Sequence, residues 1–148
     1  MDDAELLGVA IEQAQIGRSE GGVPIGAAIL VDDRVVGAGR NRRVQLGSAI
    51  RHGETDALEV AGRLPASAYR RATMATTLSP CDMCTGAILL YGIPRLVVGE
   101  NRTFYGGEDY LRSRGVEVVN LDSDECYDLI QGFIAEHPGI WNEDIGEE

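Results

Sequence analysis

Residues 72–92 read ATMATTLSPCDMCTGAILLYG, and this stretch predicts a strand that runs directly into a helix. Residues 72–78 form a Thr-rich apolar run of strand length. Ser79 is expected to cap the helix, and Pro80 suits its first position because a missing backbone N–H costs nothing there. The helix should end at Gly92. A strand followed by a helix is the repeating unit of an α/β fold.

The rest of the chain supplies further elements around this unit. Apolar periodicity predicts helices over residues 3–17, 52–61, 108–114 and 124–136, and strands over residues 25–31, 35–40, 96–98 and 116–121. A polar loop is expected over 41–48, and Pro138-Gly139 should end the last helix. This order predicts a single α/β domain over 1–148, a three-layer α/β/α sandwich around one mixed five-stranded sheet whose later strands are parallel.

Charge and hydropathy exclude several kinds of partner. The net charge is −11, and all 13 basic residues are arginine, so the chain as a whole should repel nucleic acid. A local run of Arg40, Arg42, Arg43 and Arg51 is read as a solvated loop edge and not as a phosphate track. No membrane span or secretory signal is visible, so we expect a cytoplasmic protein that does not bind membranes.

Two of the three cysteines lie at a predicted helix start. An odd number of cysteines in a cytosolic chain argues against a disulfide framework. Cys81 and Cys84 are three residues apart, so both sulfurs should face one side of the helix, where its positive end favours the thiolate form. Cys126 lies among apolar residues of an amphipathic helix, and we expect it to pack in the core.

His52 at another predicted helix start would complete a set of one imidazole and two thiolates. Three protein ligands leave the fourth tetrahedral position of Zn²⁺ to water, which is typical of catalytic and not of structural sites. Glu54 lies two residues after His52 and should point away from the metal ligands. We therefore expect Glu54 to act as general acid/base towards a zinc-activated hydroxide.

Each of these features has a simpler interpretation when it is taken alone. His52 could be a helix cap or a surface residue, and Glu54 could belong to a solvated helix face. The Cys81–Cys84 pair could be structural or redox-active. The combination of all three favours a hydrolytic metal site.

The order of these residues resembles a known signature. His52-Gly53-Glu54 followed by Pro80-Cys81-Asp82-Met83-Cys84 is similar to the H-x-E…P-C-x-x-C pattern of zinc-dependent nucleobase deaminases. Longer stretches resemble the fungal-type cytosine deaminases of the cytidine/deoxycytidylate deaminase superfamily. They include residues 21–26, 78–94 and 97–101, and Trp141 with residues 143–146. The resemblance spans nearly the whole chain.

The resemblance implies a cytidine deaminase-like fold, one Zn²⁺ per subunit, a homodimer and a free nucleobase as substrate. Asn41 would hydrogen-bond the ring edge of the base, and Asp144 would accept a hydrogen bond from its amino group or ring N–H. Gly53 would offer a backbone group near the metal. The apolar walls around the ring would come from Ile25, Phe104 and Trp141.

The expected reaction is hydrolysis of cytosine to uracil and ammonia. Three departures from the family pattern, at Arg51, residues 55–57 and Asn142, leave open another free base such as guanine, a modified base or an s-triazine-like ring. Deamination of tRNA adenosine is disfavoured by the acidity of the chain. A non-catalytic zinc domain would need a fourth ligand, for which Asp82 and Cys126 are poorly placed.

Overall fold

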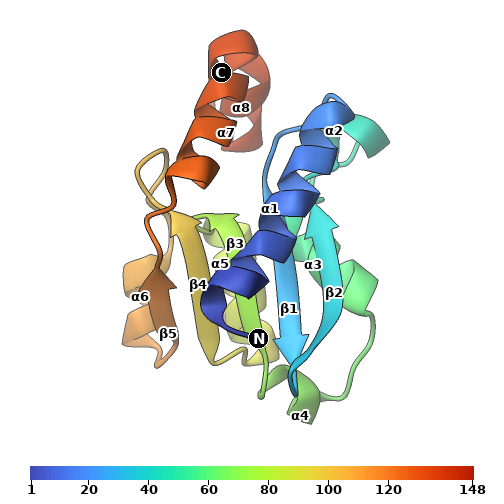
Figure 1. Ribbon diagram of the computed structural model, residues 1–148, viewed down its shortest axis with the longest axis vertical. Coiled ribbons are helices and arrows are strands. Elements are labelled where there is room, and N and C mark those ends of the chain that lie inside the picture. The colour runs from blue at the N-terminus through green and yellow to red at the C-terminus, as the bar shows by residue number, and fades with distance from the viewer.

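Five strands form one mixed sheet in the computed structural model, which describes all 148 residues (Figure 1). The strands are β1 (Gly26–Val31), β2 (Arg34–Arg40), β3 (Thr73–Leu78), β4 (Arg95–Glu100) and β5 (Glu117–Asn120). Their order across the sheet is β2-β1-β3-β4-β5. β1 pairs antiparallel with β2 and β3, whereas β3, β4 and β5 are parallel. The predicted fold class is therefore confirmed.

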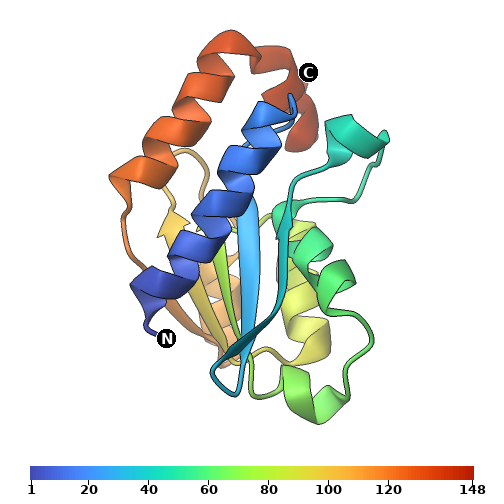
Figure 2. The ribbon, with the colours of Figure 1, turned by 45° about the vertical axis from the view of Figure 1, so that its right-hand side comes forward.

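Helices cover both faces of this sheet. They are α1 (Asp3–Ser19), α2 (Arg43–Leu46), α3 (Gly53–Ala61), α4 (Ala66–Tyr69), α5 (Asp82–Tyr91), α6 (Glu108–Ser113), α7 (Asp124–Glu136) and α8 (Pro138–Asp144). Turning the molecule by 45° shows α1 on one side of the sheet, with α3 and α5 on the other (Figure 2). None of the helices combines the length and the hydropathy that crossing a bilayer requires.

The alternation of side chains along each strand divides the core into two layers. Ala28, Ala75 and Val97 face α1 and the first turn of α7, where they pack with Leu6, Leu7, Ala10 and Cys126. Their neighbours face α3, α5 and α6, and this larger cluster includes Ala27, Ile29, Met74, Leu96, Val98, Ile88 and Leu111. Such a period of two is expected for strands that are covered on both faces. Cys126 is buried in the core as predicted.

Two glycines of β2 let α3 approach the sheet closely. A Cβ atom on Gly39 would lie 2.3 Å from the backbone nitrogen of Ala57, and one on Gly37 would lie 2.5 Å from its carbonyl oxygen. Real Cβ contacts are never this short, so a side chain at either position would displace the helix. Because neither residue has a side chain, α3 can pack close to the sheet. This helix begins directly after His52.

The predicted cap at Ser79 is wrong. The helix begins at Asp82 with Cys81 as its N-cap, and Ser79 lies before it in the loop that leaves β3. The hydroxyl of Ser79 donates a 2.7 Å hydrogen bond to the buried carboxylate of Glu108 and accepts one from the Gly106 N–H at 3.0 Å. A buried carboxylate needs such donors, and this tertiary demand outweighs the local capping preference.

The helix over residues 124–136 has the predicted bounds, but the prediction that it is the last helix is wrong. α7 ends at Glu136, and Pro138 then opens a second helix, α8. Proline favours the first turn of a helix because its fixed φ is already helical and its nitrogen needs no acceptor. Short helices also replace predicted irregular chain at α2 and α4. The consequence for the site is that Trp141 and Asp144 are carried by an ordered helix.

Replacing Ser79 by alanine should lower the free energy of unfolding by about 1–3 kcal/mol, because the buried Glu108 carboxylate loses a donor. Urea denaturation would measure the loss. Ser113→Ala is the matched control, since that hydroxyl bonds a carbonyl on the exposed side of α6, and its effect should be within about 0.5 kcal/mol. Equal stability of the two variants would contradict the role given to Ser79.

Candidate metal centre and active site

One imidazole nitrogen and two sulfurs converge between the starts of α3 and α5. Nδ1 of His52 lies 3.4 Å from the Sγ atom of Cys81 and 3.8 Å from that of Cys84. The three ligand atoms all lie within 4.8 Å of one another. The structure thus brings together the three residues that the sequence proposed as metal ligands.

The spacing fits a tetrahedral zinc ion. Bond lengths of about 2.3 Å to sulfur and about 2.0 Å to nitrogen place two tetrahedral ligands about 3.6 Å apart. The two measured nitrogen–sulfur distances lie on either side of this value. One imidazole and two thiolates are also a donor set that zinc favours. The residues present therefore fit the ion, and they supply three of its four ligands.

Both ligand groups sit at helix N-termini. His52 is the N-cap of α3 and Cys81 is the N-cap of α5, and each has the extended backbone that caps adopt. Cys84 follows in the first turn of α5. Because the free N–H groups at a helix start carry partial positive charge, this position favours the thiolate form of Cys81, whereas the hydrogen bond with Cys81 and burial raise the pKa of Cys84.

The second nitrogen of the imidazole faces a carboxylate. Nε2 of His52 lies 3.5 Å from Oδ2 of Asp144, which comes from α8 near the other end of the chain. Histidines that bind metals usually direct their second nitrogen at a carboxylate or carbonyl, which fixes the ring orientation. Asp144 can therefore orient the imidazole so that Nδ1 points at the two sulfurs.

The electrostatics before a metal binds favour a charged pair of His52 and Cys81. The hydrogen bond from the Cys84 thiol, together with the nearby imidazole, lowers the pKa of Cys81 to about 4. Burial lowers the pKa of His52, but the Cys81 sulfur and the carboxylates of Asp144 and Glu54 outweigh it and raise that pKa to about 9. Cys81 is thus already in the thiolate form that binds metals.

Glu54 is buried beside these ligands without belonging to their set. Its side chain is 4% exposed and lines the same cavity as His52 and Cys81. Burial raises the pKa of its carboxyl to about 7, although the neighbouring imidazole opposes the rise. A carboxyl group in these surroundings can exchange a proton with a molecule in the cavity.

The cavity above the ligands is mainly apolar, with a few polar groups. It is lined by Ile25, His52, Glu54, Leu78, Ser79, Cys81, Phe104, Trp141, Asp144 and Ile145. The three predicted apolar walls, Ile25, Phe104 and Trp141, are all among them. The lining comes from both halves of the chain, and α8 contributes its last turns. A flat ring held between such walls would meet the polar groups at its edges.

Asn41 and Gly53 lie next to the cavity without lining it. The side chain of Asn41 is fully buried, and its amide donates a 2.7 Å hydrogen bond to Oδ1 of Asp144. Gly53 packs against the start of β1, where a Cβ atom would lie 3.2 Å from the Cα atom of Gly26. Asn41 therefore reaches the site through Asp144, and Gly53 allows α3 to begin close to the sheet.

Four residues at or near the site escaped the sequence analysis. Leu78, Ser79 and Ile145 line the cavity, and Arg43 lies 3.8 Å from Oδ1 of Asp144. Ile145 could have been found from its spacing of four residues from Trp141, had the helix at Pro138 been predicted. The positions of Ser79 and Arg43 depend on partners far along the chain, for which the sequence carried no local signal.

Comparison with known proteins points to one family. A family profile described as the cytidine and deoxycytidylate deaminase zinc-binding region matches residues 1–100. The matched region contains all three converging donors, which assigns zinc to the site. It ends before α7 and α8, so the helix that closes the cavity lies outside it.

Individual relatives extend this result. A cytosine deaminase from Candida albicans is 58% identical over 147 residues, which cover 99% of this chain and 98% of that protein. A tRNA-specific adenosine deaminase from Streptococcus pyogenes is 33% identical over 103 residues, 69% of this chain and 65% of that protein. The solved structure of a guanine deaminase from Nitrosomonas europaea is 25% identical with a TM-score of 0.75, covering 91% of this chain and 85% of that one.

Replacing Cys81 by alanine should reduce the zinc content from about one ion per chain to well below half, because two donors hold zinc poorly. Metal analysis after dialysis against a weak chelator would measure it. Cys126→Ala is the matched control and should keep its zinc, since that thiol packs in the core away from the donors. Retention of zinc by the Cys81 variant would contradict the assignment.

Proposed function

The chain belongs to the zinc-binding cytidine and deoxycytidylate deaminase family, and on this basis we propose that it hydrolyses free cytosine to uracil and ammonia. The observation that carries the substrate is the 58% identity to a cytosine deaminase over nearly the full length of both proteins. That match extends into the C-terminal part of the chain, where α8 forms one side of the cavity.

The cover provided by α8 supports a small free substrate. Trp141, Asp144 and Ile145 all come from this helix or its C-cap and line the cavity together with the zinc donors His52 and Cys81. A base within a polynucleotide would have to enter with its sugar and flanking phosphates attached. A helix across the cavity leaves a free base as the more suitable occupant.

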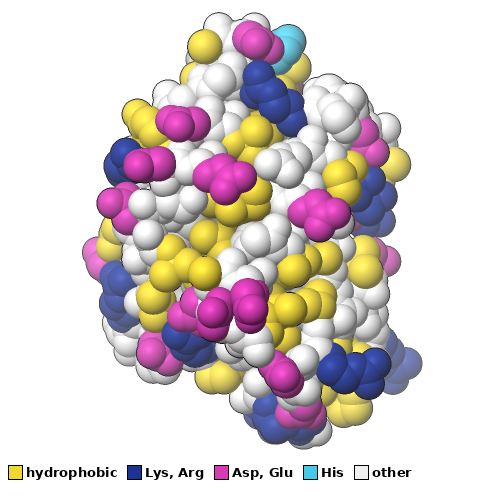
Figure 3. Space-filling view, viewed as in Figure 1, with side chains coloured by type: hydrophobic (Ala, Val, Ile, Leu, Met, Phe, Trp, Pro, Cys, Tyr) yellow, Lys and Arg dark blue, Asp and Glu magenta, His cyan; other side chains and the backbone are white.

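The charges around the site also argue against a polynucleotide. Arg40, Arg42, Arg43 and Arg51, which we expected to form a solvated loop edge, are paired with carboxylates. The pairs are Arg40–Glu20, Arg42–Asp56, Arg51–Asp56, and Arg43 with Glu143 and Asp144. On the face that carries α1, acidic side chains are interspersed with the basic ones (Figure 3). Arginines already paired in this way offer little to a phosphate backbone.

In the mechanism that we propose, each polar residue has a separate task. His52, Cys81 and Cys84 would hold the zinc ion, which when bound supplies Lewis-acid activation of water. Glu54 accepts a proton from water as the oxygen adds to the amino-bearing ring carbon. It passes this proton to the ring nitrogen and then carries the second proton, from the newly added hydroxyl, to the amino group, so that one water is consumed, the ring carbon becomes a carbonyl and ammonia leaves.

Asn41 and Asp144 would hold the base in register. Asp144 can accept a hydrogen bond from an N–H group of the base, while the amide of Asn41 fixes the orientation of that carboxylate. Ile25, Phe104 and Trp141 would enclose the faces of the ring and exclude bulk water. We further propose that Gly53 contributes backbone groups near the zinc ion, as the family resemblance implies.

The assembly of the protein and its location stay predictions. We propose a single deaminase domain over 1–148 that forms a homodimer. An exposed groove between α3, α4 and α5 supports the dimer, because Ile50, Leu90 and Tyr91 present apolar surface there. The cytoplasmic location follows only from the sequence analysis.

Zinc-loaded protein should release ammonia from cytosine and at least about a hundredfold more slowly from guanine, adenine and cytidine, since each is larger than the enclosed base. A coupled ammonia assay across these four compounds would measure the rates. Faster release from guanine would replace cytosine by a purine within the same family. Tight binding and deamination of tRNA at physiological salt would overturn the free-base proposal altogether.

Glu54→Gln should reduce kcat for cytosine by at least about a hundredfold, because an amide cannot accept and return the proton. Zinc content should stay at the level of the unmodified protein, which separates loss of chemistry from loss of the metal. Glu59→Gln, an exposed residue of the same helix, is the control and should keep full activity. Full turnover by the Glu54 variant would remove it from the mechanism.

A further inference from the structure

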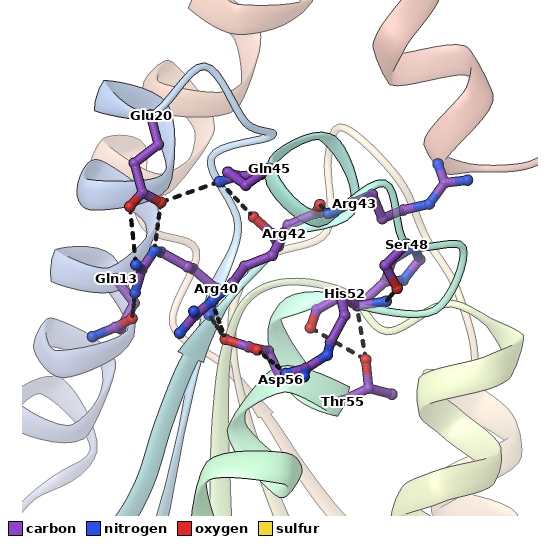
Figure 4. A network of polar contacts seen from close by, with 12 residues as sticks. Gln13, Glu20, Arg40, Arg42, Arg43, Gln45, Ser48, His52, Thr55 and Asp56 are labelled. Atoms are coloured by element: carbon purple, nitrogen blue, oxygen red, sulfur yellow. Dashed lines mark hydrogen bonds and ion pairs between the residues drawn. The ribbon is translucent and has the colours of Figure 1, made fainter.

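Asp56 is a fully buried carboxylate. It accepts hydrogen bonds from three residues that lie outside its own helix. Oδ1 accepts a 2.6 Å hydrogen bond from Nη1 of Arg51. Oδ2 accepts hydrogen bonds from Nε of Arg42 at 3.1 Å and from the backbone N–H of Arg40 at 2.9 Å. Figure 4 shows Arg40 and Arg42 beside Asp56 in the first turn of α3. We call the four residues the Asp56 clamp.

The donors of the clamp stand directly beside residues of the active site. Arg40 and Arg42 flank Asn41 on both sides, and Arg51 immediately precedes His52. The backbone adds one more link, since the Arg42 N–H donates to the Arg51 carbonyl at 2.9 Å. The carboxylate therefore ties the segment that carries Asn41 to the segment that carries His52.

Local folding does not require this arrangement. The first turn of α3 is closed by bonds that do not involve the Asp56 side chain, among them the His52 N–H to the Thr55 hydroxyl at 2.9 Å and the Asp56 N–H to the His52 carbonyl at 2.8 Å. An ionised carboxylate without exposure is costly unless all its oxygens are paired. Here both oxygens are paired. The paired charges hold the segment that carries Asn41 at a fixed position relative to the segment that carries His52. Irregular chain alone would not fix this position.

We propose that Asp56 is a positioning residue, which holds Asn41 and His52 at a fixed separation through Arg42, Arg51 and the Arg40 N–H. It touches neither the zinc ligands' donor atoms nor the substrate. It acts on the zinc site by fixing the chain that leads into His52. It acts on the pocket by fixing Asn41, whose amide orients Asp144.

Two measurements separate these effects from mere stability. Asp56→Asn keeps the shape of the side chain but turns one acceptor into a donor that faces a guanidinium group. We expect zinc to be lost to a chelator at least about threefold faster, which reports on His52. The substrate part rests on the proposed function: KM for cytosine should rise about tenfold, with kcat of the zinc-loaded variant changing less than about threefold.

Asp32→Asn is the matched control. Asp32 forms a two-point pair with Arg71, at 3.1 and 2.9 Å, but this pair is exposed and lies at the turn between β1 and β2. Asparagine tolerates the positive φ of 50° at that position. Zinc release and KM should both stay within about twofold of the unmodified protein, because exposed ion pairs contribute little.

A second variant guards against failure of the first to fold. Arg51→Met removes one donor whose side chain is 30% exposed and leaves Asp56 bound to Arg42 and to the Arg40 N–H. Faster zinc release and a higher KM for cytosine, each smaller than in Asp56→Asn, would support the proposal. Zinc release and KM both unchanged, with only a lower melting temperature, would overturn it. Zinc release is independent of turnover, so it decides the matter even if cytosine proves not to be the substrate.

Discussion

The structure depends on the meeting of two helix starts. Zinc needs one nitrogen and two sulfurs at tetrahedral distances, and His52 and Cys81 reach that spacing only because α3 and α5 begin side by side at the sheet. The helix ends supply the positive potential that keeps sulfur ionised. Fold and chemistry are thus coupled, because the same close packing that buries the apolar faces also brings the metal ligands together.

A second requirement is that a part of the chain far from the metal ligands in the sequence closes the cavity. The family match ends at residue 100, yet Trp141 and Asp144 line the cavity from α8. Asp144 contacts both Asn41 and His52, so the same carboxylate links the metal ligand to the polar edge of the pocket. The region that matches the family profile supplies the metal site, whereas α8 and its C-cap supply Trp141, Asp144 and Ile145 to the lining of the cavity.

Features with a local signal were predictable from the sequence, and features that depend on distant partners were not. Short apolar runs bounded by turn residues predicted the strands, and the pattern of His52, Cys81 and Cys84 predicted the cluster that the structure contains. The prediction that Ser79 caps a helix was wrong, because its hydroxyl instead donates a hydrogen bond to the buried carboxylate of Glu108. Asp56 and the arginines that it binds are separated in the sequence. Their spacing did not predict that one carboxylate would bind these arginines.

The glycines at 37 and 39 carry a consequence for how this chain can vary. Neither residue lines the cavity or binds the metal, but a single methyl group at either would push α3 and with it the imidazole of the metal site. The two positions therefore constrain the metal site through the absence of a side chain, and they do so through the helix that packs directly on β2. The geometry of the metal site thus depends on two residues that have no side chain and take no part in the chemistry.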